Sequence, residues 1–446
     1  MQWQALVGKA EEWEVKEDGY SEEVSSLFLD HLPSKILEAK NQAEQLLTLQ
    51  EKPVLDIAEY NHAKVLAAFQ EERVSTYHLQ GTTGYGLGDS GRETLDRVMA
   101  RILGTEAALV RGQFVSGTHA IATALFGVLR PGDHFISVTG DPYDTLEEVI
   151  GIRGTGQGSL KDFGVSYDSV PLSEEGTIQH SLVSQGIKPN TKMLILQRSR
   201  GYAWRNSLPM EQIATFVAYV REHFPHLIIF VDNCYGELVE KCEPGDVGAD
   251  LMAGSLIKNL GGSLAPTGGY IAGRQELVEK AACRLTAPGI GGEVGATLSW
   301  QLQFFQGLFF SPLTVSEAIR GAIFSAAFWQ ALGFEVNPLP DALRTDLIQA
   351  VKLNSREAMI AFCQGFQKGS PVDSHVLPIP SGMPGYEDEI IMAGGTFIQG
   401  ATSEFSADGP MRDPFIAYQQ GGVSMNYIKF GNLLAAQKLW EQGLLK

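Results

Sequence analysis

Short apolar runs and helix-like segments alternate through the middle of the chain. Short, mainly apolar runs of the kind that form strands lie at residues 134–138, 193–197, 227–232 and 268–273. Between the second and the third, residues 208–224 carry apolar side chains at the spacing of an amphipathic helix. Continuous apolar strands separated by such helices are typical of a parallel sheet that is covered on both faces. The sequence therefore predicts an α/β fold with a mainly parallel sheet.

The two ends of the chain carry different patterns. A charged segment rich in Leu, Ala and Glu, from about residue 22 to 72, predicts helices that are broken at Pro33 and Pro53. After about residue 312, a long apolar helical segment leads into a region with fewer strands and more Gly and Pro turns. We expect a helical N-terminal arm, a large domain and a smaller α+β C-terminal domain, at residues 1–75, 76–311 and 312–446.

Charge and composition narrow the classes of partner. The chain has 34 Lys and Arg against 52 Asp and Glu, a net charge of −18, which argues against nucleic acid and anionic membranes. The first 20 residues are charged throughout and do not resemble a secretory signal, so a cytoplasmic location is expected. The uncharged stretch 294–316 is long enough to span a bilayer, but three glutamines and Pro312 interrupt it. We interpret it as buried between domains or subunits.

The four cysteines show no paired spacing of the kind that binds metals. In a reducing compartment they are most simply free thiols. No metal site is predicted.

Two charged residues stand at the carboxyl ends of apolar runs, where parallel sheets bind ligands. Asp232 ends the run 227–232 and is either a helix cap or a charge partner for a bound ligand. Lys258 is the only charged residue between Asp250 and Arg274, and it is flanked by small, neutral residues. In such a pocket the neutral amine would be favoured, and a neutral amine can attack a carbonyl. The alternative is a solvated loop lysine.

Three weaker signals accompany these two residues. Ser116-Gly117-Thr118 opens a predicted helix, where free amides can bind phosphate, although a plain N-cap gives the same pattern. Tyr143 follows the run 134–138 and either stacks on a planar ring or packs on its own loop. Gly86-x-Gly88-x-x-Gly91 has the form of a dinucleotide fingerprint, but no apolar strand precedes it. We interpret it instead as a glycine-rich loop that presents Tyr85 and Arg92 to an anion.

One cofactor accounts for all of these groups. Pyridoxal phosphate needs a lysine for a Schiff base, a carboxylate for its ring nitrogen, a phosphate cradle and a stacking aromatic ring. The sequence supplies Lys258, Asp232, Ser116-Gly117-Thr118 and Tyr143 for these four needs.

The order of these residues, with "GSLIKNLGG" around the lysine, resembles the fold-type I pyridoxal-phosphate enzymes. Four strings are similar to the cystathionine beta-lyase and methionine gamma-lyase related family, often labelled aluminium resistance protein: "TGYGLGDSGRETLD", "DPYDTLEEVIG", "QRSRGYAWR" and "GGTFIQGATSEFSADGPMRDP". The likeness runs from about Tyr77 to the C-terminus. It implies a seven-stranded type of sheet, an amino-acid substrate, and a homodimer or homotetramer with shared active sites.

The resemblance also implies residue roles. Lys258 would bond the cofactor, Asp232 would pair with its ring nitrogen, and Tyr143 would stack on the ring. Phosphate would be bound by Ser116, Gly117, Thr118 and Ser255. Tyr85 would reach a phosphate or substrate across a subunit interface, and Arg92 would either join it or pair locally.

Related lyases use a C-terminal arginine to bind the substrate carboxylate. Arg412 is the candidate here, and a salt bridge with Asp413 is the alternative. Arg198, Arg200 and Arg205 follow the run 193–197, so one of them, Arg200 above all, is a second candidate for substrate binding, with surface exposure as the alternative.

The sequence thus favours a carbon–sulfur lyase that acts on a sulfur amino acid by abstraction of the α proton. An aminotransferase or another amino-acid lyase would use the same first steps. The alternative from another class is a pyridoxal-phosphate-binding protein without turnover, linked to metal tolerance. Such a protein would not need Arg412.

Overall fold

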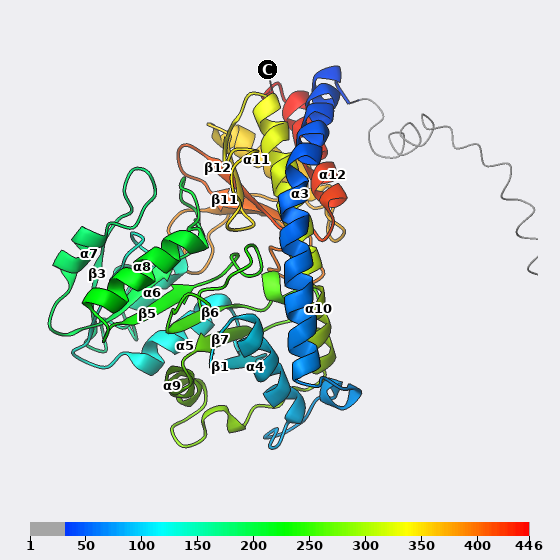
Figure 1. The fold of residues 1–446 in the computed structure, drawn as a ribbon. Helices are drawn as coiled ribbons and strands as arrows, with labels where there is room; N and C mark the ends of the chain where they lie inside the picture. The colour runs from blue at the N-terminus through cyan, green and yellow to red at the C-terminus, as the bar shows by residue number, and fades with distance from the viewer. Residues whose placement is uncertain (1–31, 446) are drawn as a thin grey trace, which may run out of the picture.

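The computed structural model describes residues 32–445, which form two sheets joined by long helices (Figure 1). The larger sheet has seven strands in the order β1-β7-β6-β5-β4-β2-β3. Only β7 runs antiparallel to its neighbours, so the prediction of a mainly parallel sheet is confirmed. The strands are β1 (Ala107–Arg111), β2 (His134–Ser137), β3 (Ser166–Ser169), β4 (Thr191–Gln197), β5 (Ile228–Asp232), β6 (Leu251–Ser255) and β7 (Gly269–Gly273).

The four apolar runs of the sequence correspond to β2, β4, β5 and β7. The predicted helix at 208–224 is α8, and the helix predicted after the Ser-Gly-Thr turn is α5. The helices of this part of the chain are α4 (Ser90–Ile102), α5 (Gly117–Val128), α6 (Asp144–Ile150), α7 (His180–Gly186), α8 (Met210–His223) and α9 (Gln275–Leu285). Short 3-10 turns lie at η2 (Thr76–Leu79), η3 (Asn259–Gly261) and η4 (Gly291–Glu293).

Strand alternation divides the core between the two faces of this sheet. In β5, Ile228 and Phe230 pack in a cluster with residues of α5 and α9. Ile229 and Val231 pack on the opposite face with residues of α8. Because successive side chains of a strand point to opposite faces, Asp232 continues the row of Ile228 and Phe230 toward α5.

The N-terminal arm is one helix, α3 (Ser34–Glu71), with Pro53 inside it. It begins directly after Pro33, as predicted, but the predicted break at Pro53 is wrong. An internal proline costs a helix about 3 kcal/mol, and burial of Ala43, Leu47 and Val65 along α10 offsets that cost. The arm therefore shares the core of the protein (Figure 1). The charged start and the segment from residue 22 lie outside the described residues.

The second long helix, α10 (Gln301–Ala331), contains Pro312. The expected domain boundary at residue 312 falls inside this helix, which continues from the large domain into the smaller one. Phe304, Phe305 and Leu308 of the uncharged stretch are buried, whereas Phe309 and Leu313 are exposed in the single chain. Of the helices described, none is long and apolar enough to cross a membrane.

The C-terminal region contains an antiparallel sheet in the order β10-β11-β12-β9-β8. Helices α11 (Arg356–Gln367) and α12 (Met425–Glu441) pack on each other beside it. Its strands are β8 (Glu335–Asn337), β9 (Gln349–Lys352), β10 (Ile390–Ala393), β11 (Ser406–Pro410) and β12 (Ile416–Gln420). This confirms the smaller α+β unit expected after the large domain.

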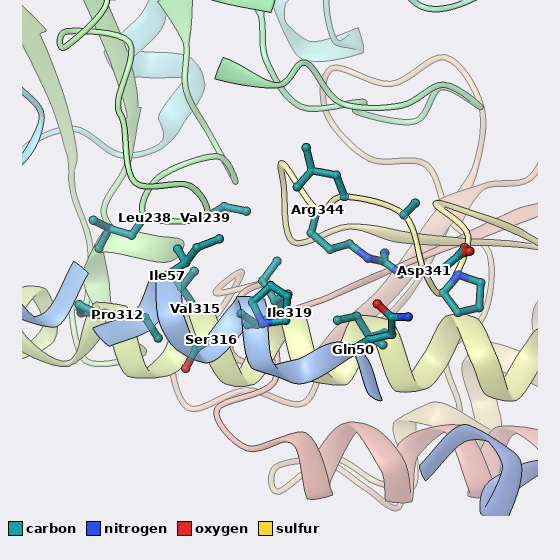
Figure 2. A pocket seen from close by; sticks show the side chains of 17 residues that line it. Gln50, Ile57, Leu238, Val239, Pro312, Val315, Ser316, Ile319, Asp341 and Arg344 are labelled. Carbon is teal, nitrogen blue, oxygen red and sulfur yellow. The ribbon is translucent and has the colours of Figure 1, made fainter. Parts of the chain in front are cut away.

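A cavity of about 270 Å³ lies between α3, α10 and the loop 340–344 (Figure 2). Both internal prolines, Pro53 and Pro312, line it. Its walls are mainly apolar, with Gln50, Asp341 and Arg344 at the polar end.

Helix α10 also supports the segment that follows β6. A Cβ on Gly307 would lie 2.2 Å from the carbonyl oxygen of Gly261, and a Cβ on Gly262 would lie 2.2 Å from the carbonyl oxygen of Gly307. Gly262 has φ of +52°, which also favours glycine. The glycines after Lys258 thus allow the close approach of a protein backbone.

This contact predicts that Gly307→Ala destabilises the protein, because its methyl group must displace the backbone of the loop. We expect a loss of about 1–3 kcal/mol in the free energy of unfolding, as for overpacked cores. Urea denaturation measures it. Gly382→Ala is the control, since no atom lies within 4 Å of its Cβ position; equal stability of the two variants would contradict the prediction.

Candidate active site

A second cavity, of about 250 Å³, lies at the carboxyl ends of β4, β5 and β6. The C-terminal region closes its other side with residues that include Tyr386, Thr402 and Asp408. Seven residues singled out in the sequence line this cavity: Ser116, Gly117, Thr118, Tyr143, Asp232, Ser255 and Lys258. The fold therefore brings together positions that span more than a hundred residues of the chain.

The large sheet orients three of the polar side chains. Gln197 is the register partner of Asp232, which in turn is paired with Ala253. By strand alternation, Gln197, Asp232 and Ser255 lie on the face that is covered by α5. Parallel strands that end together thus place an amide, a carboxylate and a hydroxyl below the start of one helix.

The N-terminus of α5 forms the next part of the cavity wall. Ser116 caps the helix, and its Oγ accepts a hydrogen bond of 3.0 Å from the backbone N–H of His119. The first amides of a helix have no partner within it and attract anions. A Cβ on Gly117 would lie 3.3 Å from Cβ of Ser255 and 3.4 Å from Sγ of Cys234, so glycine lets the helix approach β6.

Asp232 is buried at the end of β5 and accepts a hydrogen bond of 3.1 Å from the backbone N–H of Cys234. Burial raises the pKa of this carboxyl, and the charge of Lys258 opposes that effect. The hydrogen bond to Cys234 closes a turn of the chain, but no helix is described between β5 and β6, so the interpretation of Asp232 as a helix cap is wrong.

Lys258 lies two residues beyond the buried Leu256, with Nζ 3.9 Å from the centre of the Tyr235 ring. Burial acts to lower its pKa, but the acidic groups of Cys234, Tyr235, Asp232 and Glu237 outweigh burial and raise the pKa. The expectation of a neutral amine was therefore wrong for the protein alone. Lys258 is isolated from acids along the sequence but not in space.

Glu237 is a buried acid close to this lysine that the sequence reasoning missed. Tyr270 donates a hydrogen bond of 2.8 Å to its Oε1, while Oε2 has no partner within the described residues. Burial raises the pKa of Glu237 to about 8. It therefore holds a proton through part of the neutral range.

Aromatic rings form one side of the cavity around Tyr143. The backbone N–H of Tyr143 donates to Oε1 of Gln197 at 2.7 Å, and its hydroxyl contacts that of Tyr386. Its ring centre lies 5.6 Å from that of Tyr202, which lies 5.2 Å from that of Tyr418. The Gln197 contact joins the backbone of Tyr143, in the loop between β2 and α6, to the end of β4.

Asp408, in β11, is a second buried acid that sequence reasoning missed, and it lines the cavity. It accepts hydrogen bonds from the hydroxyl of Tyr202 at 3.0 Å and from Nε2 of Gln420 at 2.9 Å. Burial raises its pKa to about 7. Cys234 and Tyr235 could have been found, because they directly follow Asp232 at the end of β5. Asp408 carries no such signal, because it lies in a short strand with small neighbours.

Tyr85 and Arg92 do not line the cavity of the single chain. Tyr85 is 79% exposed. Arg92 is fully buried and donates to the carbonyl oxygens of Gly86 at 2.7 Å, Gly295 at 2.9 Å and Glu293 at 3.0 Å. Arg92 therefore pairs locally, as the alternative interpretation of the sequence expected.

The four candidate arginines also lie outside the cavity lining. Arg412 is 46% exposed and pairs with Asp388 at 2.9 Å, not with Asp413. Arg200 is buried and donates to the carbonyl oxygen of Asn337 at 2.7 Å. Arg198 pairs with Glu240, and Arg205 donates to the carbonyl oxygen of Ser199. Among the lining residues that the structure describes, Lys258 is the only cation.

The cavity residues fit the needs of pyridoxal phosphate on the geometry of this structure. Backbone amides at the start of α5 suit a phosphate, with the hydroxyls of Ser116 and Thr118 beside them, and the Tyr143 ring lines the same space as Asp232 and Lys258. For metals the result differs: within residues 32–445 no group of three His, Cys, Asp or Glu side chains is arranged to hold an ion.

Comparison with known proteins agrees with this picture. The family model described as methionine gamma-lyase matches residues 36–440. The uncharacterised protein YnbB of Bacillus subtilis (strain 168) is 51% identical over 395 residues, 88% of this chain and 94% of that protein. The structure of a carbon–sulfur lyase involved in aluminium resistance, from Clostridium novyi NT, has 45% identity and a TM-score of 0.90, covering 94% of this chain and 99% of that one.

A structure from Listeria monocytogenes, described as a candidate cystathionine beta-lyase involved in aluminium resistance, is 53% identical with a TM-score of 0.88. The match covers 90% of this chain and 99% of that one. A more distant match shows the fold alone: the pyridoxal-5'-phosphate dependent protein YhfS from Escherichia coli has 16% identity and a TM-score of 0.57, over 86% and 97% of the two chains. The resemblance stated from the sequence and the predicted fold class are confirmed.

The buried Glu237 predicts a pH-dependent stability. Its pKa is about 8 in the folded protein and near 4.5 when unfolded, so the folded state loses stability as pH rises from about 4.5 to 8. Glu237→Gln removes this loss. We expect the free energy of unfolding of the variant to rise relative to that of the wild type by up to roughly 1.4 kcal/mol for each pH unit in that window. Urea denaturation at several pH values measures this difference. The exposed Glu222→Gln is the control, and parallel curves for Glu237→Gln and wild type would contradict the assignment.

Proposed function

Because this chain belongs to the methionine gamma-lyase family, we propose that it is a pyridoxal-phosphate enzyme that breaks a carbon–sulfur bond of an amino acid. The observation that carries this proposal is the convergence of Lys258, Asp232, Tyr143 and the start of α5 on one cavity. Each of these groups answers a separate need of the cofactor, and they come from four different elements of the large domain.

We assign the binding roles as follows. The amides and hydroxyls of Ser116, Gly117 and Thr118, with Ser255, would bind the phosphate. The Tyr143 ring would stack on the cofactor, and its backbone is held by Gln197. Asp232 would accept a hydrogen bond from the protonated ring nitrogen, and this positive partner would stabilise its buried carboxylate.

When bound, the cofactor supplies an electron-withdrawing ring that stabilises negative charge at the α carbon of the substrate. Lys258 would hold the cofactor through Nζ until the amino group of the substrate takes its place, and the freed Nζ would then accept the proton from the α carbon. The electron pair of the broken carbon–sulfur bond leaves with sulfur, which takes up a proton and departs as a thiol. Because Nζ must be neutral to accept a proton, neutralisation of the neighbouring acids favours its action.

A second candidate, a pyridoxal-phosphate-binding protein without turnover and linked to metal tolerance, has one observation in its favour. The described cavity lining contains no arginine to bind a substrate carboxylate, and Arg412 pairs with Asp388 instead. An aminotransferase would use the same lysine and aspartate, and its products distinguish it.

We also propose that the protein acts as a homodimer or homotetramer. Tyr85 and its neighbour Leu87 are exposed in the single chain, as are Phe309 and Leu313 of α10. Covering such apolar side chains would favour association. In that assembly Tyr85 would reach the active site of the neighbouring subunit.

The cofactor role predicts that purified protein mixed with pyridoxal phosphate is yellow, with a visible absorption band that Lys258→Ala removes. The band requires a covalent bond to Nζ, which alanine lacks. Absorption spectroscopy measures it, and Lys192→Ala, an exposed lysine on β4, should keep the band. A colourless wild type would contradict the cofactor assignment.

The lyase role predicts a 2-oxo acid, ammonia and a thiol in equal amounts from cystathionine or methionine, with hydrogen sulfide in place of the thiol from cysteine, and with one water consumed. Pyruvate would indicate loss of sulfur from the β carbon, and 2-oxobutanoate from the γ carbon. We expect Lys258→Ala to lower the rate at least about a hundredfold, as for loss of a general base. Bound cofactor with no oxo acid would favour the binding protein, and amino transfer without thiol release would indicate an aminotransferase.

A further inference from the structure

The side of the active-site cavity formed by the C-terminal region is acidic. Asp408 lies there with Tyr386, Met392, Thr402 and Gln420. None of these side chains is positively charged, and Lys258 on the opposite side is the one cation in the described lining. If Lys258, Asp232 and the start of α5 bind the cofactor, this wall faces the substrate.

Asp408 keeps acceptor capacity although it is only 3% exposed. One oxygen accepts from Tyr202 and the other from Gln420, whereas a carboxylate has about four acceptor positions. Burial of a carboxylate without enough partners is costly, so a cation at this wall would be strongly favoured. Ile348 and Met392 also line the cavity and suit the apolar chain of a thioether.

The titratable groups around Asp408 do not supply a lasting positive partner for its unused acceptor positions. Its titratable neighbours are Tyr202, Tyr235, Tyr386, Tyr418, Cys363 and Lys258. Of these, only Lys258 carries a positive charge, and that charge would be consumed when Lys258 binds the cofactor. Asp408 would then lack a cationic partner.

We propose, on the basis of the proposed lyase function, that Asp408 selects amino-acid thioethers whose sulfur-linked group carries an ammonium. Such a group would bind the free acceptor positions of Asp408 by a charge-assisted hydrogen bond. A thioether with a purely apolar group, such as methionine, would bury the carboxylate without this partner. The substrate class is therefore set by the C-terminal region, while the large domain binds the cofactor.

A matched pair of substrates tests the proposal: S-(2-aminoethyl)-L-cysteine and S-propyl-L-cysteine differ by an ammonium in place of a methyl group. We measure kcat/KM for pyruvate formation with the pyridoxal-phosphate-loaded protein. We expect the wild type to prefer the ammonium substrate by at least about tenfold, the value of one charged hydrogen bond. Asp408→Asn should bring the ratio close to one, and Asp388→Asn, a carboxylate paired with Arg412 outside the cavity, should keep it.

The outcomes separate this proposal from the proposed function. The role of Asp408 is overturned, while the lyase stands, if the wild type does not prefer the ammonium substrate in kcat/KM. It is also overturned if Asp408→Asn keeps the wild-type preference, provided that this variant melts and binds cofactor like the wild type. If neither substrate yields pyruvate, the protein does not release sulfur from the β carbon, and the assay with methionine and cystathionine decides the lyase proposal. Calorimetric binding of the same two compounds still tests Asp408. Equal affinities in that measurement overturn the proposal, and a preference lost in Asp408→Asn supports it.

Discussion

Burial of several acids around one lysine is the constraint on which the active site depends. Asp232, Glu237 and Asp408 are all buried, and each has its pKa raised by loss of solvent. Lys258 is the cation that all three share. In such surroundings the acids compete with the lysine for protons, so the charge of the cavity is set by the group as a whole. A ligand that removes the charge of Lys258 changes the protonation of every acid near it.

Local structure explains how these charges come together. Alternation along β4, β5 and β6 sends the last side chain of each strand toward α5, and the glycine at the start of α5 allows close contact with β6. Behind the lysine, the contact of Gly307 with Gly261 and Gly262 leaves no room for side chains. Closely packed backbone therefore lies on both sides of the segment that carries Lys258.

Much of this site could be predicted because strand ends are visible in a sequence. Asp232 and the turn at Ser116 each stand next to an apolar run or helix start, and Lys258 stands out by its isolation. Asp408 and Glu237 could not be found in this way, because their importance comes from contacts across the fold. The predicted helix break at Pro53 is wrong for the same reason. Proline does disfavour a helix locally, but packing of α3 on α10 outweighs that preference.

Besides the contact of Tyr143 with Tyr386, three hydrogen bonds of tyrosine hydroxyls join the large domain to the C-terminal region beside the cavity. Tyr202 donates to Asp408, Tyr418 donates to the carbonyl oxygen of Tyr202, and Tyr235 is bonded to Thr402 at 2.8 Å. Separation of the two parts would break all three, at about 1 kcal/mol each. A ligand enclosed between the two parts could leave by their separation only if these hydrogen bonds between tyrosines and the opposite part were broken first.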